Sequence, residues 1–368
     1  MSNKKASWKE VLIFSGAYIA FCVGAGFGTG QESLQYFGSW GKMGLPGLFC
    51  AIIPMALMTI LTMFDMRKYR IPDTEGIFTF YAGKYLGKVI YWYVMFYFFA
   101  MLTMLIAGAG AIFEQQFGVP SIVGRGILSL LIMFTAYFGL KKFNDVLGKL
   151  AYIIIAFAIF VPVWNIFNAQ DGFEAGSEIA KSADMIRAGS GWLDAAIMFF
   201  SWGALLNVPY AAGLVTDGKE SPLVQSKGLV LGNIVYLIMC IFPFLAMVSN
   251  MSLVGGVQAP NILLGNRIHP VIGVCFAVIT MLCIFTTATP LAWTCARAFA
   301  KEGSKRYKIL IIVLVVVAFL GGELGSFAQI LNTATSITAY VGYVLFAAML
   351  YTKLIRRPKA PAVPEAAE

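Results

Sequence analysis

The stretch Val23-Gly24-Ala25-Gly26-Phe27-Gly28-Thr29-Gly30-Gln31-Glu32 lies in the middle of the first apolar segment of the chain. Residues 11–37 are apolar enough and long enough to cross a bilayer. The stretch nevertheless holds four glycines in seven residues, followed by an amide and a carboxylate. A glycine costs about 1 kcal/mol relative to alanine inside a helix, and a charge at membrane depth is more costly still. We therefore expect this membrane-spanning helix to be interrupted here.

An interruption frees backbone N–H and C=O groups, which are tolerated at membrane depth only where they are buried in protein or line a cavity. Many transporters build their binding site from an unwound segment of this kind. The alternative is that Gly24 and Gly26 only allow another helix to pack closely. Gln31 and Glu32, directly after the glycines, favour the binding site.

The composition is that of an integral membrane protein. The chain has 368 residues, of which 59% are hydrophobic and 12% charged, and a mean hydropathy of +0.79. Soluble domains carry about a quarter charged residues. The net charge of +9 comes from lysines and arginines between the apolar segments, so it indicates membrane topology and not a nucleic-acid partner.

Enzymatic chemistry is not indicated. The sequence has no phosphate loop, no acidic or histidine cluster with metal-ligand spacing, and no serine–histidine–aspartate set. Its six cysteines all fall in predicted spans without CxxC spacing, so neither a disulfide framework nor a zinc site is expected. A single histidine leaves little capacity for acid–base catalysis. We expect no enzyme activity and no organic cofactor.

At about 20 apolar residues per span, the sequence predicts ten spans. Their limits are 11–37, 44–64, 88–113, 121–140, 146–168, 191–215, 227–249, 270–296, 308–324 and 328–352. Alternate connecting segments hold 22 of the 27 lysines and arginines. The positive-inside rule then places residues 1–10 and 353–368 in the cytoplasm. The second of these tails is rich in proline, alanine and glutamate and is predicted to be disordered.

Two connections on the opposite side are long. Residues 169–190 carry four acidic side chains, which is typical of a solvated, partly helical extracellular loop. Residues 250–269 are moderately apolar but broken by glycine and proline, which favours a re-entrant or capping hairpin over a span.

The chain divides into two halves of similar length, 11–168 and 191–352, each with five predicted spans. Because five is odd, the second half must have inverted topology. Each half opens with a disrupted span, and in the second half the disruption runs from Ser201 to Pro209, which removes a backbone donor. Interrupted spans at matching positions of two halves are a strong pointer to a transporter site. Two unrelated kinks in a packed bundle are the alternative.

Ten spans arranged as five plus five, with breaks in the first and sixth, resemble the LeuT-type fold of the amino acid–polyamine–organocation superfamily. More narrowly, residues 24–32 followed by Gln35-Tyr36-Phe37 look like the first span of the bacterial YkvI-type membrane proteins, which are classed as amino-acid permeases. The resemblance implies an all-α protein of the bacterial inner membrane that works by alternating access.

The resemblance also implies a substrate site between the first, third, sixth and eighth spans. Backbone N–H groups at the first break would hold a substrate carboxylate, since helix N-termini favour negative charge. Glu32 would bind a substrate ammonium, carry a proton or act as an outer gate. The expected substrate-site residues are Gly24, Ala25, Gly26, Gly28, Thr29, Gly30, Gln31, Glu32, Tyr97, Thr103, Ser201, Trp202, Gly203 and Asn207.

Sodium symporters of this fold bind Na⁺ between first-span carbonyls and a hydroxyl pair on the eighth span. Thr286 and Thr287 match that pair, Cys283 would add a carbonyl one turn earlier, and Ala20 and Val23 would supply the first-span carbonyls. Five neutral oxygens suit a hard cation. The alternative is that these hydroxyls bond to their own helix.

Several alternatives stay open at this stage. Proton-coupled relatives place a fifth-span lysine where sodium would sit, but Lys149 lies close to the end of its span and is expected to reach the interface instead. The leading hypothesis is a cation-coupled symporter of a small amino acid or related zwitterion, with Na⁺ as the expected coupling ion and H⁺ as the alternative. A proton-coupled carrier of a nucleobase or betaine, or a non-transporting membrane sensor, are the alternatives, because fold does not fix function. Substrate identity, stoichiometry, direction of flux and oligomeric state lie beyond the sequence.

Overall fold

The computed structural model describes residues 7–23, 25–138, 144–217 and 221–358, with the backbone only for residues 25–26, 144–151 and 217. All regular secondary structure in these residues is helical. The helices are α1 (Trp8–Cys22), α2 (Ala25–Thr29), α3 (Gln31–Tyr36), η1 (Gly38–Met43), α4 (Gly44–Lys68), α5 (Thr74–Ala82), α6 (Lys84–Phe117), α7 (Ser121–Phe138), α8 (Asn144–Phe167), α9 (Phe173–Ser182), α10 (Trp192–Asp217), α11 (Pro222–Val248), α12 (Met251–Val254), α13 (Pro260–Ile268), α14 (Pro270–Phe299), α15 (Lys305–Gly321), α16 (Phe327–Tyr351) and η2 (Thr352–Arg356).

The ten predicted spans coincide with these helices. The first corresponds to α1, α2 and α3 together, and the others to α4, α6, α7, α8, α10, α11, α14, α15 and α16. Seven of the described helices (α4, α6, α7, α10, α11, α14 and α16) are long and apolar enough to cross a membrane. The part of α8 whose side chains are described, Tyr152–Phe167, is a shorter apolar segment, and α15 has 17 residues. The all-α membrane architecture is therefore confirmed. The division into repeats at residues 11–168 and 191–352 stays a prediction.

Several spans begin where the sequence supplies a cap. Ser221 accepts a hydrogen bond from the Val224 N–H at the start of α11, and Ser304 accepts one from Tyr307 at the start of α15. Ser326 and Gln329 form a reciprocal capping box at the start of α16. These side chains satisfy backbone donors that a helix leaves unpaired at its first turn.

The predicted break in the first span is present, but the predicted break in the sixth is not. α10 continues as one α-helix from Trp192 to Asp217, through Pro209. Proline removes one backbone donor, and membrane proteins tolerate such a loss when neighbouring helices cover the helix. α10 has this cover, since it packs against α4 on one side and α16 on another.

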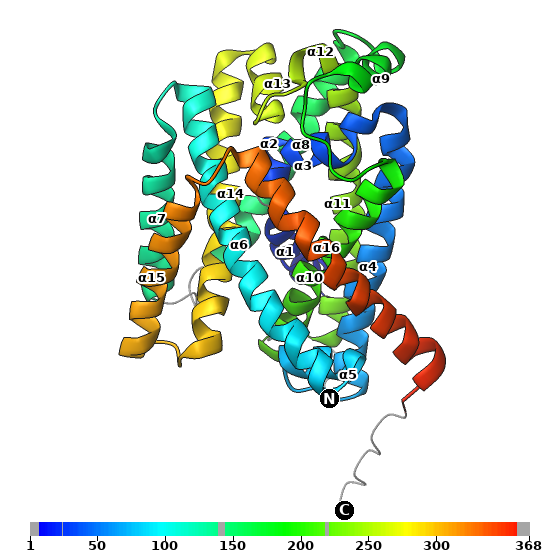
Figure 1. Cartoon of the computed structure of the whole chain (residues 1–368), viewed down its shortest axis with the longest axis vertical. Coiled ribbons are helices and arrows are strands. Elements are labelled where there is room, and N and C mark those ends of the chain that lie inside the picture. Colours follow the sequence, from blue (N-terminus) through cyan, green and yellow to red (C-terminus); the bar gives the residue numbers. More distant parts are fainter. Residues whose placement is uncertain (1–6, 24, 139–143, 218–220, 359–368) are drawn as a thin grey trace, which may run out of the picture.

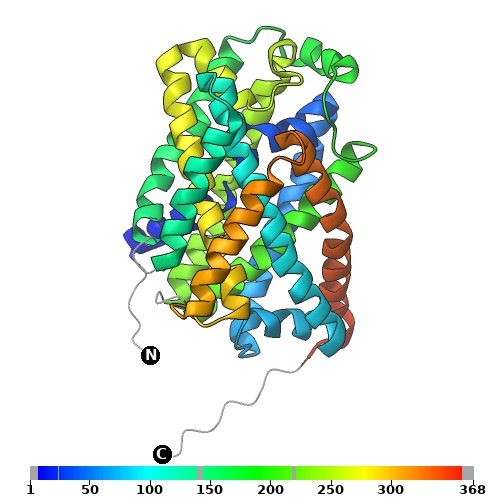
Figure 2. The same cartoon turned by 60° about the vertical axis from the view of Figure 1, so that its left-hand side comes forward.

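The interrupted first span places α2 and α3 closer to one end of the molecule than to the other (Figure 1). α9, α12 and α13 lie together at one end, and α5 lies at the opposite end (Figure 1). α16 runs along one flank between these two ends (Figure 2). α1 packs against α11 and α8, and α14 packs against α6. α2 lies against α14, α6 and α13, whereas α3 lies against η1, α11 and α10.

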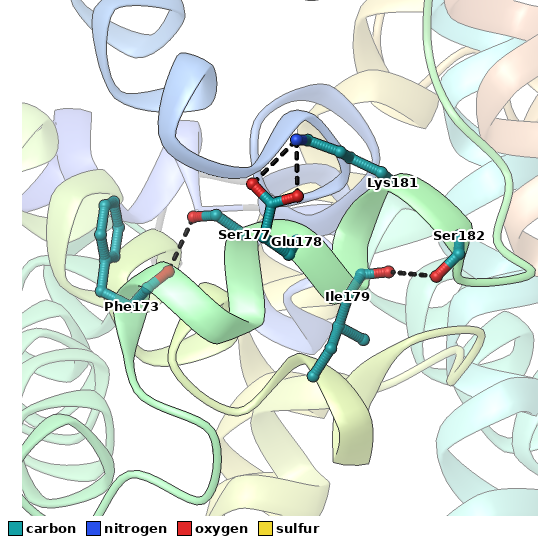
Figure 3. A network of polar contacts seen from close by, with 6 residues as sticks. All are labelled: Phe173, Ser177, Glu178, Ile179, Lys181 and Ser182. Atoms are coloured by element: carbon teal, nitrogen blue, oxygen red, sulfur yellow. Dashed lines mark hydrogen bonds and ion pairs between the residues drawn. The ribbon is translucent and has the colours of Figure 1, made fainter.

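The loop at residues 169–190 is partly helical, as predicted, because it contains α9. In Figure 3 the Ser177 hydroxyl donates to the Phe173 carbonyl at 2.7 Å, and Lys181 pairs with Glu178 at 2.6 Å on the exposed face of the helix. The hydrogen bond from the Lys181 ammonium lowers the pKa of the Glu178 carboxyl. The inner face of α9 packs on η1, where Gly41 lies against the Ser177 backbone. α9 thus covers the chain that follows α3.

Candidate functional site

The first span is interrupted twice, once on each side of α2. α1 ends at Cys22, and the Val23 N–H still bonds the Ile19 carbonyl at 2.9 Å. α2 ends at Thr29, and the following residue, Gly30, has a φ of +89° in the left-handed region. A Cβ at Gly30 would lie 2.3 Å from the Met247 side chain. Glycine is therefore required at this position both for its backbone conformation and for space.

Polar side chains from α13 and α14 meet the backbone carbonyls of α2. The Asn261 amide donates to the Phe27 carbonyl at 3.2 Å, and the Thr280 hydroxyl donates to the Gly28 carbonyl at 3.3 Å. Thr280 also packs where a Cβ on Gly28 would lie. These contacts satisfy carbonyl groups that the interruption leaves without helical partners, as membrane burial requires.

Glu32 is buried in α3. Its side chain is 5% exposed, and no described residue forms a hydrogen bond or an ion pair with its carboxylate. Tyr36, Tyr97 and Tyr236 lie within electrostatic range of that carboxylate. Buried carboxylates are costly unless they are paired or change protonation, so an unpaired one in a membrane protein is a candidate for function.

Tyr36, one of these three tyrosines, packs among further aromatic rings. The ring of Tyr36 lies 6.3 Å from that of Trp202 and 5.3 Å from that of Phe199, and its hydroxyl donates to Thr335 of α16. The Tyr97 hydroxyl and the Trp202 indole N–H are both buried, and neither has a partner among the described residues. We name Glu32, Tyr36, Tyr97 and Trp202 the central cluster.

The central cluster combines a buried carboxyl group, aromatic faces and two polar groups without described partners. Leaving a buried polar group unpaired costs about 1–3 kcal/mol. Aromatic faces attract cations by about 0.5–2 kcal/mol. A small molecule with a cationic group and a hydrogen-bonding group satisfies all three features.

The predicted α10 residues divide between different faces. Asn207 faces α1, because its amide oxygen accepts a hydrogen bond from the Cys22 thiol at 3.4 Å. Ser201 instead donates to the Ala339 carbonyl of α16 at 2.6 Å, and Gly203 faces Met55 of α4. Of the four α10 residues predicted for the site, Trp202 and Asn207 face the first span, and Ser201 and Gly203 face other helices.

The two α6 candidates also point in different directions. Tyr97 joins the central cluster. Thr103 does not, because its methyl group lies against Gly321 of α15 and its hydroxyl donates to the Phe99 carbonyl at 3.2 Å. Thr103 follows Tyr97 by six residues, which is about one and two-thirds helical turns, so the two side chains point to different sides of α6.

The remaining predicted residues near the break are accounted for as follows. Gly28 and Gly30 line the contacts of α2 with α13 and α14, and Thr29 is buried. With the Gln31 amide oriented so that its nitrogen donates, this nitrogen lies 2.9 Å from the Val257 carbonyl and 3.1 Å from the Gln258 carbonyl. Gln31 therefore points to the hairpin of residues 250–269. Gly24 lies outside the described residues, as do the side chains of Ala25 and Lys149. Of Gly26 the structure gives the backbone in α2.

The predicted cation site is brought together in part. The Thr287 hydroxyl of α14 lies 3.5 Å from the Ala20 carbonyl and 3.4 Å from the Phe21 carbonyl of α1. Both carbonyls are in the last turn of α1, where a helix leaves its C=O groups without partners. Thr287 therefore lies against the end of α1.

The neighbouring hydroxyl bonds within its own helix. Thr286 donates to the Cys283 carbonyl at 2.8 Å. Both oxygens lie on the buried face of α14, one turn apart. Phe21 supplies a carbonyl that the sequence did not single out, and the structure gives no such contact for the Val23 carbonyl.

Sequence reasoning missed several neighbours of the site. Tyr236 of α11 approaches Glu32, Asn261 and Thr280 bind the α2 carbonyls, and Thr335 holds Tyr36. Of these, only Asn261 carried a signal, as an amide inside the predicted capping hairpin. The others are single polar residues in apolar spans, which periodicity does not mark.

Comparison of the sequence with known proteins finds distant relatives. No protein-family model matches the chain. It is 23% identical over 366 residues to the uncharacterized membrane protein YkvI of Bacillus subtilis (strain 168), covering 97% of this chain and 99% of that protein. It is 27% identical over 244 residues to a gamma-aminobutyric acid permease of the same organism, covering 59% of this chain and 48% of the permease.

Solved structures match most of the chain. MhsT in complex with L-phenylalanine aligns with a TM-score of 0.64 at 14% identity, over 96% of this chain and 90% of MhsT. Mhp1, a nucleobase-cation-symport-1 family transporter, gives 0.59 at 17% identity, over 94% and 78%. A Na⁺-coupled sialic acid symporter gives 0.59 at 13% identity, over 95% and 80%. None of these five proteins is described as an enzyme. Together with the interrupted first helix, the likenesses establish that this chain is a multi-pass membrane protein with the LeuT-type fold.

Proposed function

We propose that this chain is a secondary active symporter of a small amino acid or related zwitterion, working by alternating access. The observation that carries the proposal is the central cluster. Within it the buried Glu32 forms no hydrogen bond or ion pair with a described residue, and the Tyr97 hydroxyl and the Trp202 N–H also have no described partner. A gamma-aminobutyric acid permease among the relatives, and a structural neighbour that binds L-phenylalanine, support the same substrate class.

In this proposal the substrate ammonium binds Glu32, with the rings of Tyr36 and Trp202 beside it. The ammonium supplies donors to the carboxylate, and the polar part of the substrate pairs with Tyr97 and Trp202. Charge-assisted hydrogen bonds of this kind are about twice as strong as neutral ones. For the substrate carboxylate we retain the backbone N–H groups at the first interruption, on the basis of the sequence.

For a substrate to enter from the side of α13, a small set of polar contacts between the first span and the hairpin of residues 250–269 must break. Asn261 holds the α2 carbonyls, and Gln31 faces the Val257 and Gln258 carbonyls. Each net hydrogen bond contributes only about 0.5–1.5 kcal/mol. A conformational change can therefore break these contacts while leaving the helix packing intact.

We further propose Na⁺ as the coupling ion, bound between the last turn of α1 and α14. Thr286, Thr287 and the carbonyls of Ala20, Phe21 and Cys283 supply neutral oxygens, which suit a hard cation. A bound cation would fix α1 against α14 and thereby favour the substrate-ready state. Protonation of Glu32 is the alternative means of coupling, and it would suit the proposal of a nucleobase or betaine carrier.

The proposal is tested by a thermal-shift screen on the purified protein in sodium and in choline buffers. The screen covers gamma-aminobutyric acid, the common amino acids, betaines and nucleobases. We expect stabilisation by one or more amino compounds, and greater stabilisation in sodium. Stabilisation by nucleobases alone would contradict the amino-acid proposal, and no stabilisation by any solute would favour a sensor.

Replacing Thr287 by alanine is expected to weaken sodium dependence several-fold and leave substrate selectivity unchanged. The substitution removes one oxygen that faces α1 and leaves the carbonyls in place. Sodium and substrate must raise each other's affinity by the same factor, with coupling of about 1–3 kcal/mol. The measurement is substrate affinity as a function of sodium concentration.

Thr286→Ala should behave similarly, and Thr289→Ala serves as the control. Thr289 is equally buried, and its hydroxyl donates to the Phe285 carbonyl at 2.8 Å, which is not one of the proposed ligands. Thr286 instead donates to the carbonyl of Cys283, which is one of them. Equal substrate affinity in sodium and in choline for the unmodified protein would rule out this cation site.

We also propose that the protein lies in the bacterial inner membrane with both ends of the chain in the cytoplasm. The distribution of lysine and arginine supports this orientation. A single cysteine introduced after Lys359, in a cysteine-free background, should resist a membrane-impermeant thiol reagent in intact cells and react after permeabilisation. Labelling in intact cells would reverse the orientation.

A further inference from the structure

A groove separates α16 from the junction of α5 and α6, at the end of the molecule opposite α9 and α13 (Figure 1). Its volume is about 450 Å³. Gly83 and Leu86 line one wall, Ala347 and Tyr351 line the other, and Arg356 is the charged residue in its lining. We name it the α5–α16 groove. It lies apart from the central cluster, and the proposed transport mechanism does not use it.

The last turn of the described chain fixes Arg356 beside this groove. α16 ends in the π-helical turn η2, where Thr352 donates to the Tyr81 carbonyl at 3.1 Å. Arg356 donates to the Phe80 carbonyl at 2.7 Å, and its guanidinium lies 5.6 Å from the centre of the Phe80 ring. The guanidinium is thus held in place by one of its five N–H donors, which leaves the others available.

The structure describes no ion pair that neutralises the charge of Arg356. Lys353, three residues earlier, differs because it pairs with the buried Asp65, whose other oxygen accepts from Tyr81 at 2.6 Å. Lys84 at the start of α6 and Arg357 after η2 add positive charge near Gly83 and Arg356 in the sequence.

We propose that the α5–α16 groove binds an anionic phospholipid, with an acyl chain between α16 and the start of α6 and the headgroup phosphate at Arg356. The apolar walls face a bilayer, and the unpaired guanidinium complements a phosphate. Basic pockets between membrane helices on the cytoplasmic side bind anionic headgroups in this way. The lipid would bridge the start of α6 and the end of α16.

The experiment is native mass spectrometry of the full chain released from nanodiscs of equal parts phosphatidylglycerol and phosphatidylcholine. We expect the unmodified protein to retain phosphatidylglycerol preferentially. Arg356→Gln should reduce this retention about fivefold, the value of one basic residue near an anionic surface. Ala347→Trp should reduce it similarly by filling the groove, since Ala347 is exposed and lines it.

Two substitutions elsewhere control for charge and bulk. Arg306→Gln removes an exposed positive charge at the start of α15, and Val316→Trp adds bulk at an exposed site on the same helix. Both should retain phosphatidylglycerol as the unmodified protein does. Equal retention of the two lipids would overturn the proposal, and so would undiminished retention in Arg356→Gln and Ala347→Trp. Displacement of the lipid by inorganic phosphate, or a dimer that Ala347→Trp dissociates, would assign the groove to another occupant.

Discussion

Replacing Glu32 by glutamine is expected to abolish substrate binding and uptake while leaving the protein folded. The substitution keeps the shape of the side chain and removes the charge that would face the substrate ammonium. Truncating one partner of a buried charge pair costs about 2–5 kcal/mol, which corresponds to a loss of affinity from ~30-fold to more than a thousandfold. The measurement is ligand affinity and uptake, with thermal stability recorded in the absence of ligand.

The stability measurement separates a binding role from a structural one. A buried carboxylate without a partner does not stabilise the fold, so the unliganded variant should melt at the same temperature as the unmodified protein or higher. Glu178→Gln is the matched control, because Glu178 is an exposed glutamate on α9 paired with Lys181 (Figure 3). Normal uptake by Glu32→Gln across pH 5 to 8 would show that Glu32 has no part in substrate or proton handling.

Replacing Gly30 by alanine is expected to lower stability and prevent transport together. The left-handed conformation at φ +89° costs a non-glycine residue about 1–2 kcal/mol. The added methyl would also meet Met247 at 2.3 Å and Asn261 at 2.9 Å, and overpacking typically adds about 1–3 kcal/mol. The strain acts where α2 turns into α3, so it should displace Glu32 as well. Thermal unfolding and substrate affinity are the two measurements.

Two other glycines separate the cost of backbone strain from the cost of overpacking. Gly118 has a φ of +64° and open space around its Cβ position, so Gly118→Ala reports backbone strain alone. Gly126 is helical in α7 with open space, so Gly126→Ala should keep or slightly raise the stability. A Gly30→Ala variant as stable and active as Gly126→Ala would show that the turn between α2 and α3 does not position the site.

The spans were predictable because long apolar segments separated by basic loops are the dominant signal of a membrane protein. The interruption of the first span was predictable for a local reason, since four close glycines weaken a helix wherever it lies. The sixth span shows the limit of that reasoning. Pro209 predicts a break from sequence, but α4 and α16 pack around α10 and keep it helical. Tertiary packing overrode the local preference.

The composition of the site was predictable only where sequence neighbours share it. Glu32 and Thr287 came from local motifs, and the structure places Glu32 near the phenols and Thr287 against α1. The direction in which an isolated residue on a long helix faces was not predictable. If the register of the helix is misjudged by two residues, the side chain points to the opposite side, because two residues correspond to more than half a turn. Thr103 and Ser201 show this error. Contacts from separate helices, such as that between Tyr36 and Thr335, require the assembled fold.

The most direct test of transport is accumulation of a labelled amino acid in proteoliposomes that contain the purified protein. The substrate is chosen from the thermal-shift screen, and an inward sodium gradient is compared with equal sodium on both sides and with choline. We predict accumulation above the external concentration only with the sodium gradient, lost in Glu32→Gln and retained in Glu178→Gln. Uptake that never exceeds equilibration under sodium or proton gradients, or that is the same in empty liposomes, would contradict the account.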